Sequence, residues 1–292
     1  MSKNLKAHLA LFAVALIYGA NYTIAKEVLD NDHLHPFALV LMRVLAGAAL
    51  FWLFAAFFIR EKVEKKDMPM LALCGLAGAA ANQLLFITGL KYTSHINAAL
   101  VMTTAPILVL VISWVILKEP IKLRKVLGIA IGICGAALLI IHGKKFAYTK
   151  SALNGDVLIF CNAMCYGLYL VLVKNLMRKY NPLTVIKWVF TFGVVFVLPF
   201  GTLELLNAPM NTFTPQVWMA IAYVLICTTF LAYLLNAVAL KHVSPSVVSI
   251  YIYLQPLLAT SIALMLGKDV LTTTKVAAGI LIFSGVFLVS KQ

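Results

Sequence analysis

Ten apolar stretches of about twenty residues follow one another along the chain, with only short polar gaps between them. A helix needs roughly 20 apolar residues to cross the hydrocarbon core of a bilayer. We therefore predict an all-α polytopic membrane protein with ten transmembrane helices. The predicted spans are 8–26, 37–59, 69–89, 95–117, 125–142, 153–174, 183–205, 216–239, 246–266 and 273–290.

The composition indicates which solvent surrounds these helices. Hydrophobic residues make up 63% of the chain, and the mean hydropathy is +0.98. Soluble domains contain about 45–50% apolar residues, so this chain has more apolar surface than a water-soluble core can bury. The net charge of +14 would suggest nucleic acid in a soluble protein. Here the charged residues lie mostly between apolar runs, so we expect a lipid bilayer and no nucleic acid as partner.

The distribution of lysine and arginine predicts the orientation. If the N-terminus is cytoplasmic, fifteen basic residues fall on the cytoplasmic side and seven on the far side. Cytoplasmic loops carry the excess of Lys and Arg in membrane proteins. We therefore expect both termini in the cytoplasm.

Part of the sequence is repeated at an offset of 150 positions. Leu84-Leu85 and Pro106 recur as Leu234-Leu235 and Pro256, and further matches continue toward the C-terminus. The repeat unit holds five spans, an odd number, so the second copy must enter the membrane from the opposite side. We predict inverted repeats at 1–146 and 147–292, a symmetry that suits alternating access.

Polar side chains in the spans need partners, so they are expected to face the bundle interior. Amide, hydroxyl and aromatic groups together suit a cavity that holds a zwitterion or stacks on a ring. Hydrogen bonding between helices without any substrate is the alternative. The candidate cavity residues are Tyr18, Asn21, Asn82, Gln83, Thr103, Tyr166, Tyr169, Tyr233 and Tyr253. Trp114, Asn162, Asn236 and Gln255 belong to the wider polar set.

Pro106 and Pro256 interrupt the fourth and ninth spans at matching positions. A proline inside a helix removes one backbone hydrogen bond and favours a kink. We interpret both prolines as hinges beside the cavity, with a bend that only serves packing as the alternative.

Charged residues within or next to the spans are few. Arg43 could meet a substrate carboxylate, or neighbouring carbonyls could hold it as a structural charge. Lys187 is close enough to the cytoplasmic edge to snorkel. Glu119 is expected to form a salt bridge that fastens its short loop. No span carries a carboxylate at mid-depth, so facilitated diffusion is a simpler expectation than proton coupling.

The motifs resemble the EamA type of the drug/metabolite transporter superfamily. They are Tyr18-Gly19-Ala20-Asn21 with Lys26, then Arg43, Ala105-Pro106-Ile107 and Lys118-Glu119-Pro120. The resemblance implies a ten-helix inner-membrane carrier that exports amino acids and other small metabolites. It implies a central cavity between helices one, three, four, six, eight and nine. Two departures are Tyr18, where a Trp is usual, and Asp269, which no proline follows.

We therefore expect a bacterial inner-membrane carrier that exports a small-molecule substrate, amino acids first, and no enzyme. Nucleosides or drug-like compounds are the alternative cargo, and a channel is an alternative mechanism. A membrane-embedded enzyme would need clustered His, Asp or Glu. The only such cluster, His33 and His35 beside Asp30 and Asp32, is better interpreted as a solvated loop. We expect no metal and no cofactor, and a monomer or weak homodimer, with Gly128-x-x-x-Gly132 at a close helix contact.

Overall fold

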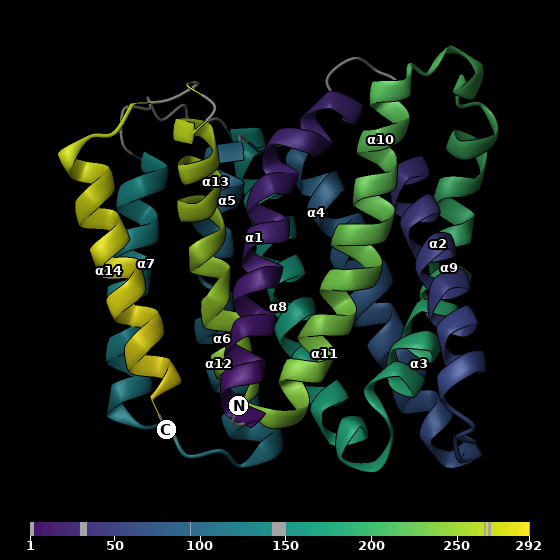
Figure 1. Ribbon diagram of the computed structural model, residues 1–292, viewed down its shortest axis with the longest axis horizontal. Helices are drawn as coiled ribbons and strands as arrows, with labels where there is room; N and C mark the ends of the chain where they lie inside the picture. The colour runs from purple at the N-terminus through teal and green to yellow at the C-terminus, as the bar shows by residue number, and fades with distance from the viewer. Residues whose placement is uncertain are drawn as a thin grey trace.

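Helices stand side by side through almost the whole molecule (Figure 1). The computed structural model describes residues 3–29, 34–93, 95–141, 150–265, 267 and 270–291. Within these ranges the regular secondary structure is entirely helical. The first matching half contains α1 Lys3–Leu29, α2 Pro36–Phe58, η1 Lys65–Asp67, α3 Met68–Gly75, η2 Leu76–Ala81, α4 Asn82–Leu90, α5 His95–Met102, α6 Ala105–Leu117 and α7 Leu123–Ile141. The second contains α8 Lys150–Lys179, α9 Pro182–Leu206, η3 Met210–Thr212, α10 Pro215–Tyr223, η4 Val224–Leu231, α11 Ala232–His242, α12 Pro245–Ile250, η5 Tyr251–Tyr253, α13 Leu254–Met265 and α14 Thr273–Ser290.

Nine helical stretches of the described chain are long and apolar enough to cross a membrane. Some are composite: α3, η2 and α4 form one stretch, and α10, η4 and α11 form another. α1 is a further helix of 27 residues that packs between α11 and α13. The prediction of an all-helical polytopic membrane protein is therefore confirmed. The N- and C-terminal ends lie at the same end of the bundle (Figure 1), which we call the terminal face.

The helices depart from regular α geometry at positions that match between the two halves. η2 is a π-helical segment between α3 and α4, and η4 is the π-helical segment at the corresponding place between α10 and α11. Thr103 and Thr104 separate α5 from α6, and the 3₁₀ turn η5 interrupts the other half at the same register. Pro106 and Pro256 each follow such a break within the first turn of the next helix. A proline is tolerated there because the first turn has no intrahelical acceptor for its missing N–H.

The helix contacts also come in matching pairs. α1 packs against α11 and α13, and its counterpart α8 packs against α4 and α6. α2 packs against α9, and α7 packs against α14. When the two halves of the sequence are exchanged, the contacts of α1 become those of α8, and the α2–α9 and α7–α14 contacts each map onto themselves.

Glycines allow α7 and α14 to approach closely. A Cβ atom on Gly128 would lie 2.9 Å from the Gly285 carbonyl oxygen, and one on Gly285 would lie 2.6 Å from the Gly128 oxygen. Both distances are shorter than van der Waals contact, so any larger residue must separate the helices. Gly128 of the Gly128-x-x-x-Gly132 motif therefore lies at a close helix contact within one chain, between α7 and α14.

Carboxylates cap α2 and α9 at opposite ends of their shared contact. Glu204 Oε2 accepts hydrogen bonds from the backbone N–H groups of Phe37 (2.8 Å) and Ala38 (3.1 Å), at the start of α2. Glu61 Oε2 accepts one from Asn181 N (3.0 Å), directly before α9. An anion is favourable at a helix N-terminus because the first N–H groups have no partner in the helix.

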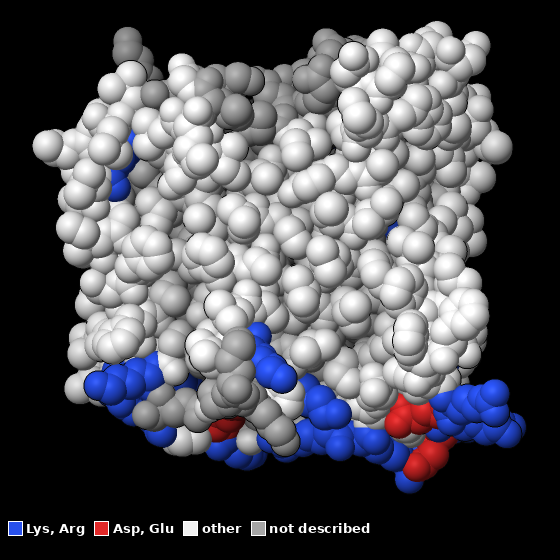
Figure 2. All heavy atoms as spheres, viewed as in Figure 1, with Lys and Arg blue, Asp and Glu red and all other residues white. Residues whose placement is uncertain are grey.

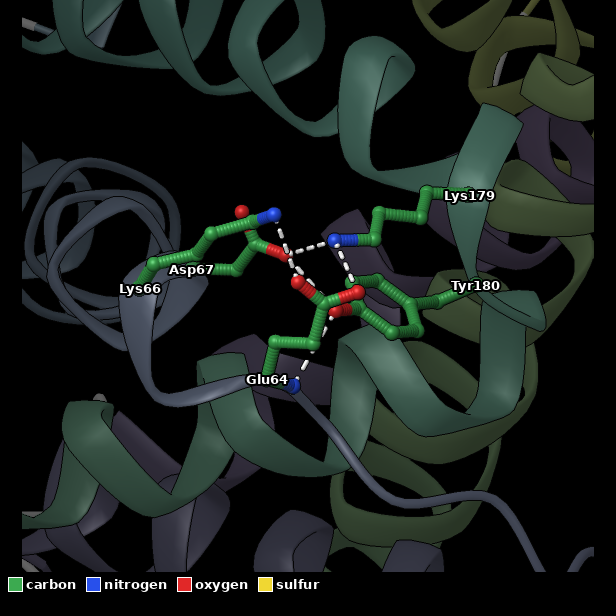
Figure 3. Close-up of polar contacts among 5 residues, drawn as sticks. All are labelled: Glu64, Lys66, Asp67, Lys179 and Tyr180. Carbon is green, nitrogen blue, oxygen red and sulfur yellow. Dashed lines mark hydrogen bonds and ion pairs between the residues drawn. The ribbon is translucent and has the colours of Figure 1, made fainter.

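Five residues on the terminal face form a polar clasp between the α2–α3 loop and the end of α8 (Figure 3). Lys179 Nζ lies 2.6 Å from Glu64 Oε1 and 2.6 Å from Asp67 Oδ2, and Lys66 Nζ lies 2.7 Å from Glu64 Oε2. Tyr180 OH donates to Asp67 Oδ2 at 2.6 Å and accepts from Glu64 N at 3.1 Å. The hydrogen bonds from Lys179 and Lys66 lower the pKa of Glu64.

We expect Gly285→Leu to destabilise the protein by about 1–3 kcal/mol, because the new side chain must push α7 from α14. Thermal unfolding in detergent measures the change. Ser284→Leu is the control, because Ser284 is the preceding residue of α14 and its side chain is exposed. Equal stability of Gly285→Leu and wild type would contradict the close contact.

We expect the clasp to stabilise the protein at neutral pH and to lose this effect in acid. The pKa of Glu64 is lower in the folded chain than its ordinary value of 4.5, so its contribution is present above that value. It is lost as the pH falls through the lowered pKa. The melting temperature of Lys179→Gln should therefore lie below that of wild type at pH 7, and the gap should narrow below pH 4.5. A gap that is constant with pH would contradict the role of the carboxylate.

Candidate functional site

A cavity of about 220 Å³ lies between the two matching halves of the chain. Its wall combines side chains from α1, α2, α4, α5, α8, α11, η5 and α13. The lining residues are Tyr18, Arg43, Asn82, Gln83, Phe86, Ile87, Met102, Asn162, Tyr166, Tyr169, Leu170, Tyr233, Asn236, Ala237, Leu240, Ile252 and Gln255. We call this space the central cavity.

Tyrosines form an aromatic wall, and the π-helical segment η2 helps to position two of them. Tyr233 OH donates a hydrogen bond to Gly78 O at 3.1 Å, and the rings of Tyr233 and Tyr169 have centroids 6.4 Å apart. The Tyr169 ring lies so close to Gly78 that a Cβ there would collide with it. π-helical turns often occur at functional sites, since they displace backbone carbonyls from the regular ladder. In this protein such a turn supplies both an acceptor and the space for a ring.

Five amide side chains line the cavity, and three of them hydrogen-bond to backbone oxygens. Asn82 and Asn162 bond reciprocally, because the Nδ2 of each donates to the backbone oxygen of the other. Gln83 Nε2 donates to Ala79 O at 3.0 Å. The side-chain oxygens of Gln83 and Asn162 are buried and accept no hydrogen bond from the described residues. An unpaired buried acceptor costs about 1–3 kcal/mol, so a donor brought by a ligand would stabilise this wall.

Arg43 is the only charged side chain among the described residues that line the central cavity. Its Nε donates to Thr229 Oγ1 at 3.0 Å, and Thr229 Oγ1 donates to Val224 O at 2.9 Å within η4. The side chain is therefore held through a threonine hydroxyl and not by carbonyls directly. Among the residues that the structure describes, no Asp or Glu lines the cavity, so the potential from this lining favours a ligand with a negative group.

A second cavity of about 490 Å³ shares Phe86, Met102, Ile252 and Gln255 with the first. It is lined by Phe86, Leu90, Ala98, Ala99, Met102, Thr103, Ala136, Leu139, Ile140, Ile252, Tyr253, Gln255, Pro256, Ala259 and Thr260. Leu90 lies at the end of the α3–η2–α4 stretch, and Ile140 lies near the end of α7. Both stretches begin at the terminal face, so this cavity extends toward the opposite face. Tyr253 OH donates to Thr103 O at 2.7 Å and joins the two helix breaks across it.

The two halves are packed differently around these cavities. Ala99 lines the second cavity and is half-buried, whereas its counterpart Ser249 is fully buried in α12. Every residue of α12, Pro245–Ile250, is buried. α12 is therefore tightly packed near the terminal face, whereas the matching α5 borders a cavity that extends toward the opposite face.

A model of the EamA-like transporter family matches residues 5–141 and again residues 153–291. The chain belongs to the EamA-like transporter family. This confirms the resemblance to the drug/metabolite transporter superfamily that the motifs indicate. The family consists of membrane transporters, which points to transport and not to catalysis as the activity of this chain.

Known relatives extend over the full length of this family member. YyaM of Bacillus subtilis (strain 168), an uncharacterized transporter, is 27% identical over 297 residues, which cover 99% of this chain and 97% of the relative. An uncharacterized transporter of Archaeoglobus fulgidus is 28% identical over 295 residues, which cover 99% of this chain and 99% of the relative. A protein of Streptantibioticus cattleyicolor named a probable terminal-alkyne amino-acid exporter is 28% identical over 80% of this chain and 76% of its own length. A protein crystal structure with 18% identity and a TM-score of 0.80 covers 97% of this chain and 95% of its own, which shows a shared fold.

Most of the residues proposed from the sequence line the two cavities of this EamA-family chain. The central cavity contains Tyr18, Arg43, Asn82, Gln83, Tyr166, Tyr169 and Tyr233, and the second contains Thr103, Tyr253 and Pro256. Asn21 and Pro106 line neither of them. The central cavity is also lined by Asn162, Asn236 and Gln255. Each is a polar residue within one helical turn of a candidate tyrosine, and this spacing in the sequence could have predicted their place in the wall. Phe86, Met102 and Ile252 carry no such signal, because apolar residues occur all along the spans.

Two side chains lie differently from the sequence interpretation. Lys187 was expected to snorkel, but it is only 7% exposed and its Nζ lies 4.4 Å from the centroid of the Trp52 ring. Trp52 Nε1 donates to Thr191 Oγ1 at 2.8 Å, which holds the ring in place for this cation–π contact. Trp114 is 53% exposed and does not face the interior. An indole is apolar enough for lipid and needs only one partner, which explains the difference.

Glu119 Oε2 lies 3.5 Å from Lys125 Nζ, at the loop between α6 and α7. The side chain of Lys26 and residues 268–269 lie outside the described part of the structure, as do Asp30, Asp32 and His33.

Proposed function

We propose that this protein is an inner-membrane carrier that exports small metabolites, with amino acids as the substrate class, by alternating access. The observation that carries the proposal is the chemistry of the central cavity. One arginine, unpaired amide oxygens and a tyrosine wall surround this space, and none of its described lining residues is a carboxylate.

These groups match the two ends of a zwitterion. The guanidinium of Arg43 is suited to a carboxylate. The buried amide oxygens of Gln83 and Asn162 can accept from an ammonium group, and tyrosine faces attract cations as well. The relative from Streptantibioticus cattleyicolor, named as an amino-acid exporter, supports this choice.

The polar groups of the central cavity favour amino acids over the alternative cargo. The cavity of about 220 Å³ adjoins the second cavity of about 490 Å³, so the polar groups and not the size carry this choice. Nucleosides could stack on the tyrosines, but they present no carboxylate to Arg43. Amino acids therefore use more of the polar groups in the wall.

We propose ten transmembrane helices, with α1 as the tenth, in two inverted repeats at 1–146 and 147–292. The two separate family matches support the duplication, and so do the paired π-helical segments and paired helix contacts. We take the terminal face as cytoplasmic. Figure 2 supports this orientation, because Lys and Arg gather along that edge of the visible face and the wall above it is nearly uncharged.

In this conformation the carrier would be closed toward the cytoplasm and hollow toward the outside. The buried α12 and the second cavity support this state. Exchange of the packing between the two halves would produce the opposite state. Pro106 and Pro256, next to the breaks in the fourth and ninth spans, are the proposed hinges. A monomer is sufficient for this mechanism, and without a carboxylate in the cavity lining we favour facilitated diffusion.

The transport prediction concerns Arg43. Arg43→Met should lower saturable uptake of a radiolabelled amino-acid mixture into proteoliposomes by about 10- to 100-fold, because a hydrogen bond to a charged group contributes about 1.5–3 kcal/mol. Lys187→Met is the matched control, since it removes another buried cation that lines neither cavity. Equal uptake by both variants would argue against an amino-acid carboxylate at Arg43. Currents through single channels would argue against a carrier.

The hinge prediction concerns the two prolines. Pro106→Ala with Pro256→Ala should slow counterflow and leave substrate affinity nearly unchanged, because alanine removes the ring that keeps each helix from continuing across its break and leaves the polar wall unaltered. Thermal-shift titration measures the affinity. A large loss of affinity at normal counterflow rate would indicate that the prolines shape the cavity and do not act as hinges.

A further inference from the structure

A pocket of about 270 Å³ lies on the terminal face, separate from the transport cavities. Three parts of the chain meet there: the loop between α6 and α7, the turn between α11 and α12, and the end of α14. The lining residues are Glu119, Pro120, Lys122, Arg124, Lys125, Ser244, Val247, Val289 and Lys291. We call it the basic pocket.

The basic pocket has an excess of positive charge. Four of its residues are cationic and one is acidic. Glu119 is paired with Lys125. Within the described part of the chain, no carboxylate lies within ion-pair distance of Lys122 or Arg124. These two cations can therefore bind an external anion.

The backbone adds to this preference. α7 begins at Leu123, and the N–H groups of Lys125 and Val126 both bond to Lys122 O. The N–H groups of the first helical residues before them have no acceptor within the helix. A helix of 19 residues also directs the positive end of its dipole toward this spot.

The surroundings of the pocket indicate a lipid and not a free ion. Leu123 is 72% exposed beside the cations, and Ile121, Val126 and Leu127 are also exposed. These apolar side chains start the outer surface of a membrane-spanning helix. A phosphate in the pocket would thus continue directly into acyl chains along α7.

We propose that the basic pocket binds the headgroup phosphate of an anionic phospholipid. The proposal requires only that α7 begins at a headgroup layer, so it holds whichever substrate the carrier moves. Lys122 and Arg124 hold the phosphate, and Ile121 and Leu123 contact the acyl chains. Because the pocket joins segments of both halves on the closed side, bound lipid stabilises the conformation described here.

Native mass spectrometry of the purified protein with added phosphatidylglycerol or phosphatidylcholine tests the proposal. Wild type should retain phosphatidylglycerol in preference to phosphatidylcholine. Each basic residue near an anionic lipid contributes about 1 kcal/mol, or about fivefold in affinity. Lys122→Gln with Arg124→Gln should therefore weaken phosphatidylglycerol binding by about 25-fold.

Two further variants control for charge and folding. Lys62→Gln with Lys65→Gln removes the same charge from exposed side chains of the terminal face outside the pocket, and should leave binding unchanged. Lys122→Arg with Arg124→Lys keeps the charge and should retain binding. Equal losses in both glutamine variants would overturn the proposal, since the basic residues would then act only as a diffuse surface charge. Displacement of phosphatidylglycerol by an equal concentration of inorganic phosphate would overturn it in favour of a free-anion site.

Discussion

Lipid offers no hydrogen bonds, and this constraint governs both the shape of this protein and the place of its function. Backbone groups in the spans must bond within their own helix, so the regular secondary structure of the described chain is helical. Polar side chains in the spans must find partners inside the bundle. Asn82 bonds to Asn162, Arg43 to Thr229, and Tyr233 to Gly78. The central cavity forms where these groups gather.

The segments of irregular backbone lie next to the two cavities. Gly78 lies in one π-helical segment and Thr229 in the other, and each accepts a hydrogen bond from a residue of the cavity wall. The breaks before Pro106 and Pro256 border the second cavity through Thr103 and Tyr253. Non-helical backbone at membrane depth is tolerated when it is buried in protein or lines a cavity. Such departures from α-helical geometry would be costly if they faced lipid. Here they supply hydrogen-bond acceptors to the cavity wall, and they lie beside the proposed hinges.

Charged residues follow a different rule, because water and headgroups at the terminal face can solvate them. The clasp around Lys179 and the basic pocket around Lys122 and Arg124 both occupy this face. The clasp pairs its charges internally, whereas the pocket leaves cations available. Glu204 shows that an isolated carboxylate near a helix end is stable when it caps N–H groups, here those of Phe37 and Ala38.

Much of this protein follows from its sequence, because lipid imposes a strong pattern on each span. The apolar runs predict the helices to within a few residues, and the amides and tyrosines predict most of the polar wall. The sequence cannot show that α12 is buried while the matching α5 borders a cavity, since the two segments have similar patterns. It also cannot show that Lys187 lies over Trp52, or that Phe86 and Met102 line the cavity. These features depend on how helices distant in sequence pack together, and only the tertiary structure decides which face of each helix meets a partner.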